Sequence, residues 1–205
     1  MSLLPTVYLA AEDLPGLAVG RRLIAEASPL LIHREENGHG YGTLRKKVKN
    51  YQKMASFGYP VLMLTDLDRV HCPSELLRNW ISEQPHPNFL FRIAVREVES
   101  WLLADSCSLA EFLQIEVIHI PADPDSLVDA KSELLKLAQR SPRKIRTGLL
   151  PRPGSRATIG PEYNSLLNQF IISCWDIEKA AQQSPSLQRA RSATMALAIK
   201  LRASF

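Results

Sequence analysis

The chain has 205 residues, of which 45% are hydrophobic and 22% are charged, and it carries a formal net charge of +4. This length allows one large domain or two small ones, and the composition excludes a wholly disordered, collagenous or coiled-coil chain. The cysteines Cys72, Cys107 and Cys174 are too few and too widely spaced for a disulfide framework, so we expect a reducing, cytoplasmic setting. Because no apolar run approaches the roughly 20 residues that cross a bilayer, we expect neither membrane insertion nor export.

The net charge is unevenly distributed along the chain. Residues 1–130 hold 12 Lys and Arg against 17 Asp and Glu, a balance of −5, whereas residues 131–205 hold 13 against 4, a balance of +9. This division suits a protein that gathers carboxylates around metal ions in one region and binds a polyanion with another. The alternative is that the C-terminal Lys and Arg side chains only solvate the surfaces of helices.

The first hundred residues alternate between short apolar runs and amphipathic stretches, a pattern typical of βα units around a buried parallel sheet. Residues 37–42 contain three glycines and predict a mobile loop. Pro73 suits the first position of a helix, because its missing N–H costs nothing there. We expect strands at 6–11, 30–33, 59–65 and 89–95, and helices at 15–27, at about 43–57, from 73 and from about 96.

After residue 120 the pattern becomes purely helical, with apolar residues at helical spacing in 126–139, 161–175 and 186–203. Between the first two of these helices, residues 141–156 are rich in Pro, Gly and Arg and predict a long basic loop. The sequence therefore predicts an α/β fold, with a mostly parallel sheet flanked by helices and an all-helical C-terminal extension. We expect residues 1–120 to form the α/β core and residues 121–205 to pack on it as part of one structural domain.

Acidic residues follow three of the four predicted strands. They are Glu12 and Asp13 after the first strand, Asp66 and Asp68 after the third, and Glu97 and Glu99 after the fourth. An acid beside a buried strand is costly unless it binds something. Because the carboxyl ends of parallel strands share one edge of a sheet, where open α/β proteins place their sites, we expect these acids to converge.

Such a cluster needs cations, because like charges a few ångströms apart raise one another's pKa. Mg²⁺ or Mn²⁺ is the natural occupant, since these hard ions take carboxylate and phosphate oxygens as ligands. In an extended segment Asp66 and Asp68 would face the same way and bind one ion. The alternative for this pair alone is an exposed turn with two solvated acids.

The residues around these acids resemble a known family. A strand followed by Glu12 and a later strand followed by Asp66-x-Asp68 are similar to the signature of the TOPRIM fold, the metal-binding core of topoisomerases, primases, OLD-family nucleases and recombination mediators. Residues 96–105, with Glu99 two residues before Trp101, resemble the hallmark of DUF4276 proteins, a small TOPRIM-like group. Further matches are Glu12-Asp13, Gly40-Tyr-Gly42, Leu64-Thr-Asp-Leu-Asp68, Asp129-Ala-Lys131, Gly160-Pro-Glu-Tyr-Asn164 and Ser184-Pro-Ser-Leu187.

The resemblance implies a divalent-metal site in which Glu12 acts as an acid or a metal ligand and Asp66 and Asp68 bind the metal. Glu99, together with Glu97, would contribute to a second ion or orient the first. One departure is the residue after Glu12, which is aspartate here and glycine in many TOPRIM proteins. The resemblance also implies an ATPase partner protein and a role in defence against phage or mobile DNA.

Metal-assisted cleavage of a phosphodiester also needs a cation that offsets the negative charge building on phosphorus. We assign this role to Lys131, which opens a helix where the acidic and basic regions meet; the alternative is an ordinary surface lysine. Basic side chains in 43–57 and 141–156 suit phosphate contacts, which give affinity without sequence preference. They are Arg45, Lys46, Lys49, Arg143, Lys144, Arg146, Arg152 and Arg156.

The sequence therefore predicts a Mg²⁺- or Mn²⁺-dependent nuclease. Two alternatives are a non-catalytic nucleic-acid-binding subunit and a metal-dependent phosphotransfer enzyme acting on a small nucleotide. The excess of Lys and Arg favours nucleic acid over a mononucleotide, but it does not choose between cleavage and binding. Tyr41, Tyr51 and Tyr163 are candidates either to stack on bases or to pack in the core.

Overall fold

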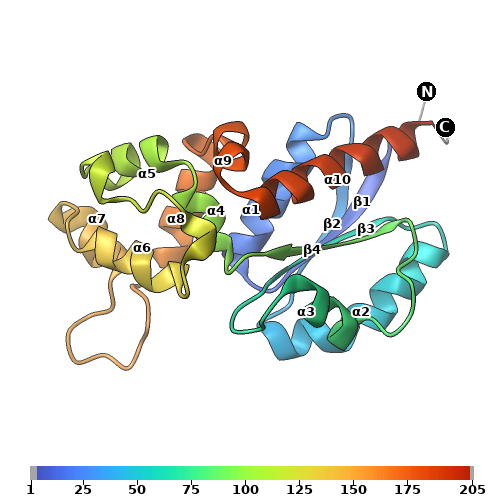
Figure 1. The fold of residues 1–205 in the computed structure, drawn as a ribbon, viewed down its shortest axis with the longest axis horizontal. Coiled ribbons are helices and arrows are strands. Elements are labelled where there is room, and N and C mark those ends of the chain that lie inside the picture. Colours follow the sequence, from blue (N-terminus) through green and yellow to red (C-terminus); the bar gives the residue numbers. More distant parts are fainter. Residues whose placement is uncertain (1–3, 204–205) are drawn as a thin grey trace.

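The computed structural model describes residues 4–203, which form an α/β fold around one parallel sheet (Figure 1). The sheet has four strands in the order β2-β1-β3-β4, and all neighbouring pairs are parallel. The strands are β1 (Thr6–Ala11), β2 (Leu31–Asn37), β3 (Val61–Asp66) and β4 (Phe89–Ala94). The predicted α/β class, with flanking helices and a helical C-terminal region, is confirmed.

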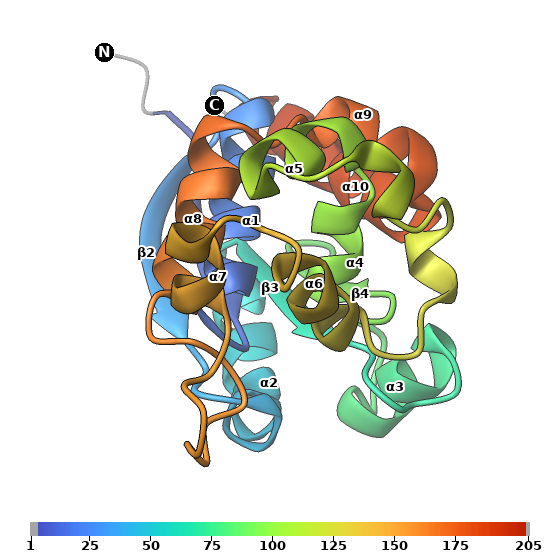
Figure 2. The ribbon, with the colours of Figure 1, turned by 90° about the vertical axis from the view of Figure 1, so that its left-hand side faces the viewer.

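Helices cover both faces of the sheet. The helices α1 (Leu14–Glu26) and α10 (Pro185–Arg202) lie on one face, and α2 (Tyr41–Ser56) and α3 (Pro73–Trp80) lie on the other (Figures 1 and 2). Alternate residues of β3 serve the two faces: Leu62 and Leu64 join the core under α1 and α10, whereas Val61 and Met63 join the core under α2 and α3. This two-sided burial explains why β3 reads as a continuous apolar run.

The remaining helices gather beyond the carboxyl end of the sheet (Figure 1). Trp101, Tyr163 and Phe170 are fully buried there and belong to the same hydrophobic core as Leu9 and Leu64 of the sheet. The core of the sheet therefore continues without a break into this helical region. Its helices are α4 (Val98–Leu103), α5 (Ser106–Leu113), α6 (Ala130–Ala138), α7 (Arg143–Leu149), α8 (Tyr163–Ser173) and α9 (Ile177–Gln183), with 3₁₀ turns at Val117–His119 and Pro124–Ser126.

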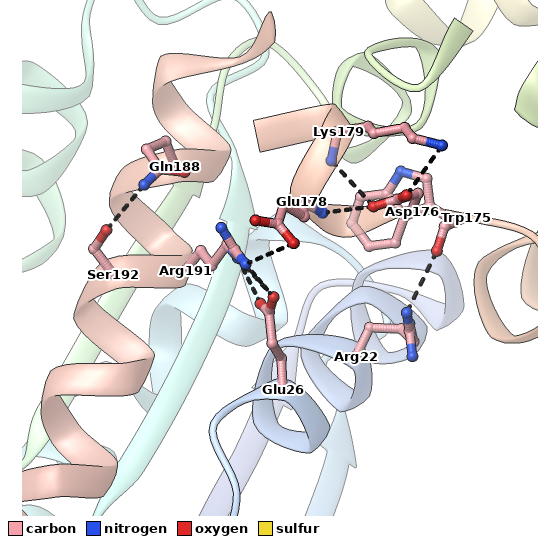
Figure 3. A network of polar contacts seen from close by, with 9 residues as sticks. All are labelled: Arg22, Glu26, Trp175, Asp176, Glu178, Lys179, Gln188, Arg191 and Ser192. Atoms are coloured by element: carbon pink, nitrogen blue, oxygen red, sulfur yellow. Dashed lines mark hydrogen bonds and ion pairs between the residues drawn. The ribbon is translucent and has the colours of Figure 1, made fainter. Parts of the chain in front are cut away.

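Ion pairs fasten the last helices to the first one (Figure 3). In α10, the Nε of Arg191 lies 2.7 Å from both carboxylate oxygens of Glu26 in α1, and its Nη2 lies 4.0 Å from Glu178 in α9. Arg22 of α1 donates a hydrogen bond to the Trp175 carbonyl at 3.4 Å. Because a bidentate arginine–carboxylate pair fixes orientation as well as distance, these contacts set how α10 crosses the sheet.

The predicted basic loop at 141–156 is only partly correct. Arg143–Leu149 form helix α7, which begins after Pro142 and buries Gly148 and Leu149. Only the segment from residue 150 to residue 162 is irregular, and Gly154 in it has a φ of 77°, which favours glycine. The sequence did not predict this helix, because its seven residues include only two buried ones and the surrounding Pro, Gly and Arg residues are typical of a loop.

Other elements also differ from the prediction, and residues 37–42, predicted as a mobile loop, contain the end of β2 and the start of α2. β2 continues to Asn37 through charged residues, because it is an edge strand with one exposed side. Helix α6 begins at Ala130 and not at 126, since the Asp129 carboxylate caps it by accepting the Ser132 N–H at 2.7 Å. Helix α9, capped by Asp176, was not predicted, because seven residues hold too few apolar positions to show a period.

Within residues 4–203, no helix is both long and apolar enough to cross a membrane.

Candidate active site

Acidic side chains meet at the carboxyl edge of the sheet, where the chain switches from one side of β1 to the other. Glu12 follows β1, and its Oε2 accepts a hydrogen bond from the Thr65 hydroxyl of β3 at 3.0 Å. Asp66 ends β3, and its Oδ1 accepts a hydrogen bond from the Val98 N–H at 2.9 Å. The ends of β1, β3 and β4 are thus joined through carboxylates at the switch point, which is where open α/β sheets bind ligands.

Asp66 lies at the centre of this group. Burial raises the pKa of its carboxyl well above the usual value, and the negative charges of Glu99, Asp13, Glu12 and Asp68 raise it further. Burial also raises the pKa of Glu12, although the hydrogen bond from Thr65 opposes the change. Five acids that are far apart in the sequence therefore lie close enough to act on one another.

Asp68 does not continue the strand, which corrects the expectation of an extended Asp66-Leu67-Asp68 segment. Its φ is 49°, in the left-handed region, and its N–H donates to the Arg96 carbonyl at 3.0 Å. The Arg96 guanidinium in turn donates to the Val70 carbonyl at 2.8 Å. Contacts with Arg96, which follows β4, therefore fix the turn that carries the Asp68 carboxyl. A non-glycine residue in the left-handed region is a strained conformation that is often found at binding sites.

Glu99 reaches the cluster from helix α4 and is only 1% exposed. Its Oε1 accepts a hydrogen bond from the Tyr163 hydroxyl of α8 at 2.6 Å and lies 3.5 Å from the Lys131 Nζ of α6. Three helices of the C-terminal region thus contribute to the site at the sheet edge. The lysine charge and the phenol hydroxyl are what permit a carboxylate to be buried here.

Lys131 points into the carboxylate cluster, as its predicted role requires. Burial opposes its charge, but the carboxylates of Glu99, Asp13 and Asp66 outweigh this effect and raise the pKa of the ammonium group. Its side chain is 35% exposed, and its Nζ lies 5.6 Å from the centre of the Tyr163 ring. Lys131 therefore stays charged and keeps part of its side chain exposed to solvent.

Glu97 and Asp13 each use one carboxylate oxygen to accept a hydrogen bond from a backbone N–H. Glu97 Oε2 accepts the Lys131 N–H at 2.8 Å and so holds the start of α6, while Asp13 Oδ1 accepts the Gly16 N–H at 2.9 Å and caps α1. Burial raises the pKa of both carboxyls. The sequence predicted that Asp13 joins the converging acids, but not that it caps α1; the signal for the cap was an aspartate placed just before Leu14-Pro15, a typical helix start.

An open cleft of about 860 Å³ leads to the cluster. Asp68 and Glu97 line it, whereas Asp66 lies beneath them. The other residues that line it are Tyr41, Arg69, Val70, His71, Glu75, Val128 and Asp129. The cleft therefore lies between the start of α2, the segment before α3 and the start of α6, and it is large enough for a nucleotide.

Of the two roles predicted for the tyrosines, packing in the core is confirmed for Tyr51 and Tyr163. Tyr163 is 1% exposed and Tyr51 is 4% exposed, so neither presents a ring to a base. Tyr51 instead donates a hydrogen bond to Glu36 at 2.8 Å. Tyr41 lines the cleft, with its hydroxyl accepting the Trp80 Nε1–H at 2.9 Å. What the sequence missed is that a tyrosine hydroxyl serves the buried Glu99, a pairing across 64 residues that local pattern does not reveal.

The predicted phosphate-binding residues are all exposed and fall into two groups. Arg45, Lys46 and Lys49 lie on α2, where Arg45 donates to the Asn79 carbonyl at 2.9 Å. The second group comprises Arg143, Lys144 and Arg146 on α7, with Arg152 and Arg156 in the irregular segment 150–162. Figures 1 and 2 show that α2 and this segment extend to the same side of the molecule.

The donor set fits a hard divalent ion by its chemistry. The cluster offers carboxylate oxygens alone, which Mg²⁺ and Mn²⁺ prefer, and it holds more acids than its nearby cations, Lys131 and Arg69, neutralise. In residues 4–203, however, no three His, Cys, Asp or Glu side chains are arranged as a ready coordination set for one ion. Binding an ion would therefore require the side chains of Glu12, Asp66 and Asp68 to draw together.

Comparison with family models, with curated proteins and with solved structures finds no match to this chain. The similarity to TOPRIM and DUF4276 proteins stays a prediction from the sequence.

Proposed function

We propose that this protein is a divalent-metal-dependent phosphodiesterase that cleaves nucleic acid. The observation that carries the proposal is the crowding of the partly buried Asp66 with four other carboxylates at the carboxyl edge of the sheet. Repulsion among neighbouring carboxylates destabilises a folded protein unless a cation or a bound proton offsets their charge. Carboxyls with strongly raised pKa values are often found at functional sites. A divalent cation with phosphate oxygens is the ligand that best matches this charge and the size of the cleft.

The residues of the chain divide the chemistry between them. Glu12, Asp66 and Asp68 would hold Mg²⁺ or Mn²⁺, with Glu99 and Glu97 behind them. When bound, the ion activates a water and stabilises charge on the phosphoryl oxygens. Glu99 and the Tyr163 ring hold the Lys131 ammonium beside the carboxylate cluster, where it would offset charge building on phosphorus.

The basic groups on α2 and α7 support nucleic acid as the substrate. They lie outside the acidic cluster, so they can bind phosphates that flank the reacting one without neutralising the metal ligands. A TOPRIM-type fold, an ATPase partner and a role in defence against phage or mobile DNA complete the proposal, and these finer points rest on the sequence similarity alone.

Cleavage of plasmid DNA and of single-stranded RNA, each with Mg²⁺ or Mn²⁺, tests the function. Wild-type protein is expected to cleave at least one of them, and Asp66→Asn and Glu12→Gln to lose at least about a hundredfold in rate, in line with the loss of a group that stabilises the transition state. Glu83→Gln, which changes an exposed acid far from the cluster, is the matched control and keeps full activity. Equal cleavage by all four proteins means a contaminant, and metal-independent binding without cleavage identifies a binding subunit instead.

A further inference from the structure

A second pocket opens at the free edge of the sheet. It has a volume of about 310 Å³ and lies between α3, β4 and α10. Arg92 of β4 and Arg189 of α10 line it, together with Ser74 at the start of α3 and Ser186 at the start of α10. No carboxylate from residues 4–203 lines this pocket, in contrast to the cleft beside Asp68.

The two arginines in this pocket lack a counter-charge. The Nε of Arg92 is buried and has no hydrogen-bond partner among the described residues, and neither Arg92 nor Arg189 forms a hydrogen bond or ion pair with another described side chain. Burial and the neighbouring charge of Arg189 both lower the pKa of Arg92. A buried N–H donor without a partner costs about 1–3 kcal/mol, and more when it is charged, so a ligand that accepts this hydrogen bond would remove a real penalty.

The open edge of β4 adds backbone donors to the same pocket. The carbonyls of Asn88 and Ala94 accept hydrogen bonds from Val61 and Leu67, so these residues face β3. Because the direction of backbone groups alternates along a strand, the N–H and C=O groups of Phe91 and Ile93 both face outward, and both residues line the pocket. The pocket therefore combines two cationic side chains with unpaired backbone N–H groups of the sheet edge.

We propose that Arg92 and Arg189 form a binding site for a phosphate group. A phosphate carries more than one negative charge and several acceptor oxygens. It can therefore neutralise both guanidinium groups and accept a hydrogen bond from the buried Nε of Arg92. A single carboxylate offers less charge and fewer acceptors for two arginines. The site is separate from the carboxylate cluster, so the proposal holds whether or not that cluster binds a metal.

The position of the pocket indicates which molecules supply the phosphate. The beginning of α3 separates it from the acidic cleft: Glu75 lines the cleft, whereas Pro73 and Ser74 line the arginine pocket. A nucleic-acid strand that crosses the start of α3 would place one phosphate at each side. A free nucleotide offers the same phosphate chemistry, and the two sources separate by experiment.

Binding measurements in EDTA test the proposal without any contribution from cleavage. The probes are a fluorescein-labelled single-stranded oligonucleotide, followed by anisotropy over a range of salt concentrations, and adenosine monophosphate, followed by calorimetry. The variants are Arg92→Gln, Arg189→Gln and the double variant. Arg202→Gln is the matched control, because it removes an exposed arginine from the last turn of the same helix α10.

The double variant is expected to bind the oligonucleotide at least about tenfold more weakly, with a salt slope smaller by about 0.7 for each lost phosphate contact. Arg202→Gln keeps the wild-type affinity and slope. If the double variant loses only adenosine monophosphate, the phosphate site serves a small nucleotide. If it binds both probes as wild type does, or if wild type binds neither, the proposal is wrong.

Misfolding is distinguishable from loss of the site. Because Arg92 and Arg189 repel each other, Arg92→Gln is expected to unfold at a temperature equal to or above that of the wild type. A variant that loses phosphate binding while keeping its melting temperature has lost a ligand contact and not its fold. Cleavage of nucleic acid with Mg²⁺ is measured separately, so failure of the nuclease proposal leaves this result interpretable.

Discussion

The Asp66 carboxyl is the least favourable charge in the site when no cation is present. It is partly buried, its Oδ1 accepts the Val98 N–H, and four other acids act on it. A carboxyl in this position either stays ionised against repulsion or takes up a proton that it would release in water, and both cost folding free energy. Selection for stability alone would not place an aspartate here.

Asp66→Asn is therefore expected to stabilise the metal-free protein. The amide keeps an oxygen that can accept the Val98 N–H and removes the charge, so we expect the free energy of unfolding to rise by about 1 kcal/mol or more, which corresponds to a melting temperature about 2–4 °C higher. Thermal unfolding in EDTA measures this. Adding Mg²⁺ should raise the melting temperature of the wild type, through preferential binding to the folded state, and leave Asp66→Asn unchanged.

The exposed acid Glu83 supplies the control, because Glu83→Gln changes the same net charge without touching the cluster. Its melting temperature is expected to match that of the wild type in EDTA and to respond to Mg²⁺ in the same way. A lower melting temperature for Asp66→Asn in EDTA would show that the carboxylate is a structural partner and not a destabilised ligand.

Lys131 supports the reaction through its charge and its position. Lys131→Met removes the ammonium beside Glu99 and is expected to lower kcat by about 10²–10³, the usual loss for a group that stabilises charge in a transition state. KM should change little if the lysine acts mainly on developing charge. Steady-state cleavage kinetics measure both constants. An unchanged kcat would show that Lys131 only pairs with Glu99 and does not stabilise the transition state.

At the scale of elements, the site depends on how helices from the end of the chain are held against its beginning. Arg191 of α10 and Glu26 of α1 form a bidentate pair whose side chains are 16% and 21% exposed. Removing one partner of a shielded pair leaves the other charge without compensation. The pair therefore links two helices that cover the same face of the sheet.

Arg191→Ala is expected to lower the free energy of unfolding by about 1.5–3 kcal/mol, the range for hydrogen bonds to charged groups. Urea denaturation followed by circular dichroism measures the change. Arg202→Ala, about three turns further along α10, should differ from the wild type by less than about 0.5 kcal/mol, as exposed substitutions do. Equal losses in both variants would refute a specific role for the Glu26 pair.

Asp125 ties the 3₁₀ turn at Pro124–Ser126 to the start of α10. Its carboxylate accepts hydrogen bonds from the hydroxyls of Ser184 at 2.8 Å and Ser186 at 3.2 Å, and Trp101 Nε1 donates to Ser186 at 2.7 Å. Burial raises the pKa of Asp125 in spite of the serine hydrogen bonds, so the folded chain binds this proton more tightly than the unfolded chain. Its contribution to stability therefore falls as pH rises from the ordinary aspartate pKa through the raised value.

Asp125→Asn removes this titration and keeps an oxygen for the serines. We expect the wild type to lose stability relative to Asp125→Asn as pH rises from about 4 toward neutrality, the direction that linkage requires when the folded state binds more protons. Urea midpoints across this pH range measure the difference. A difference that stays constant with pH, or that changes in the opposite direction, would contradict the raised pKa.

Across the whole molecule, the sequence predicts the sheet better than it predicts the site. The apolar run of β3 and the acids behind β1, β3 and β4 are local signals, and they place the carboxylate cluster at the correct edge. The bond from Tyr163 to Glu99 and the left-handed turn at Asp68 depend on helices and strands that meet only in the folded chain. Local composition also hid α7, whose Pro, Gly and Arg residues are typical of a loop.

The overall arrangement combines an acidic edge with basic surfaces around it. The helical C-terminal region closes over the end of the sheet and delivers Glu99, Lys131 and Tyr163, while α2 and α7 carry the exposed basic residues (Figure 2). The acids of the site lie in residues 1–130, where the charge balance is −5, whereas the basic residues around it come both from α2 and from residues 131–205, where the balance is +9. The arrangement suits a metal-assisted reaction on a polyanion.

Mn²⁺ binding by isothermal titration calorimetry tests the central claim most directly, because it asks whether the strand-end carboxylates hold a divalent ion. Wild-type protein and Glu83→Gln are expected to bind Mn²⁺ with the same affinity, and Mg²⁺ should compete. Asp66→Asn and Glu12→Gln are expected to weaken Mn²⁺ binding at least about tenfold. Substituting a residue that only supports a metal ligand already lowers metal affinity by about this factor. Equal Mn²⁺ affinity in all four proteins, or no binding by the wild type, would contradict the account.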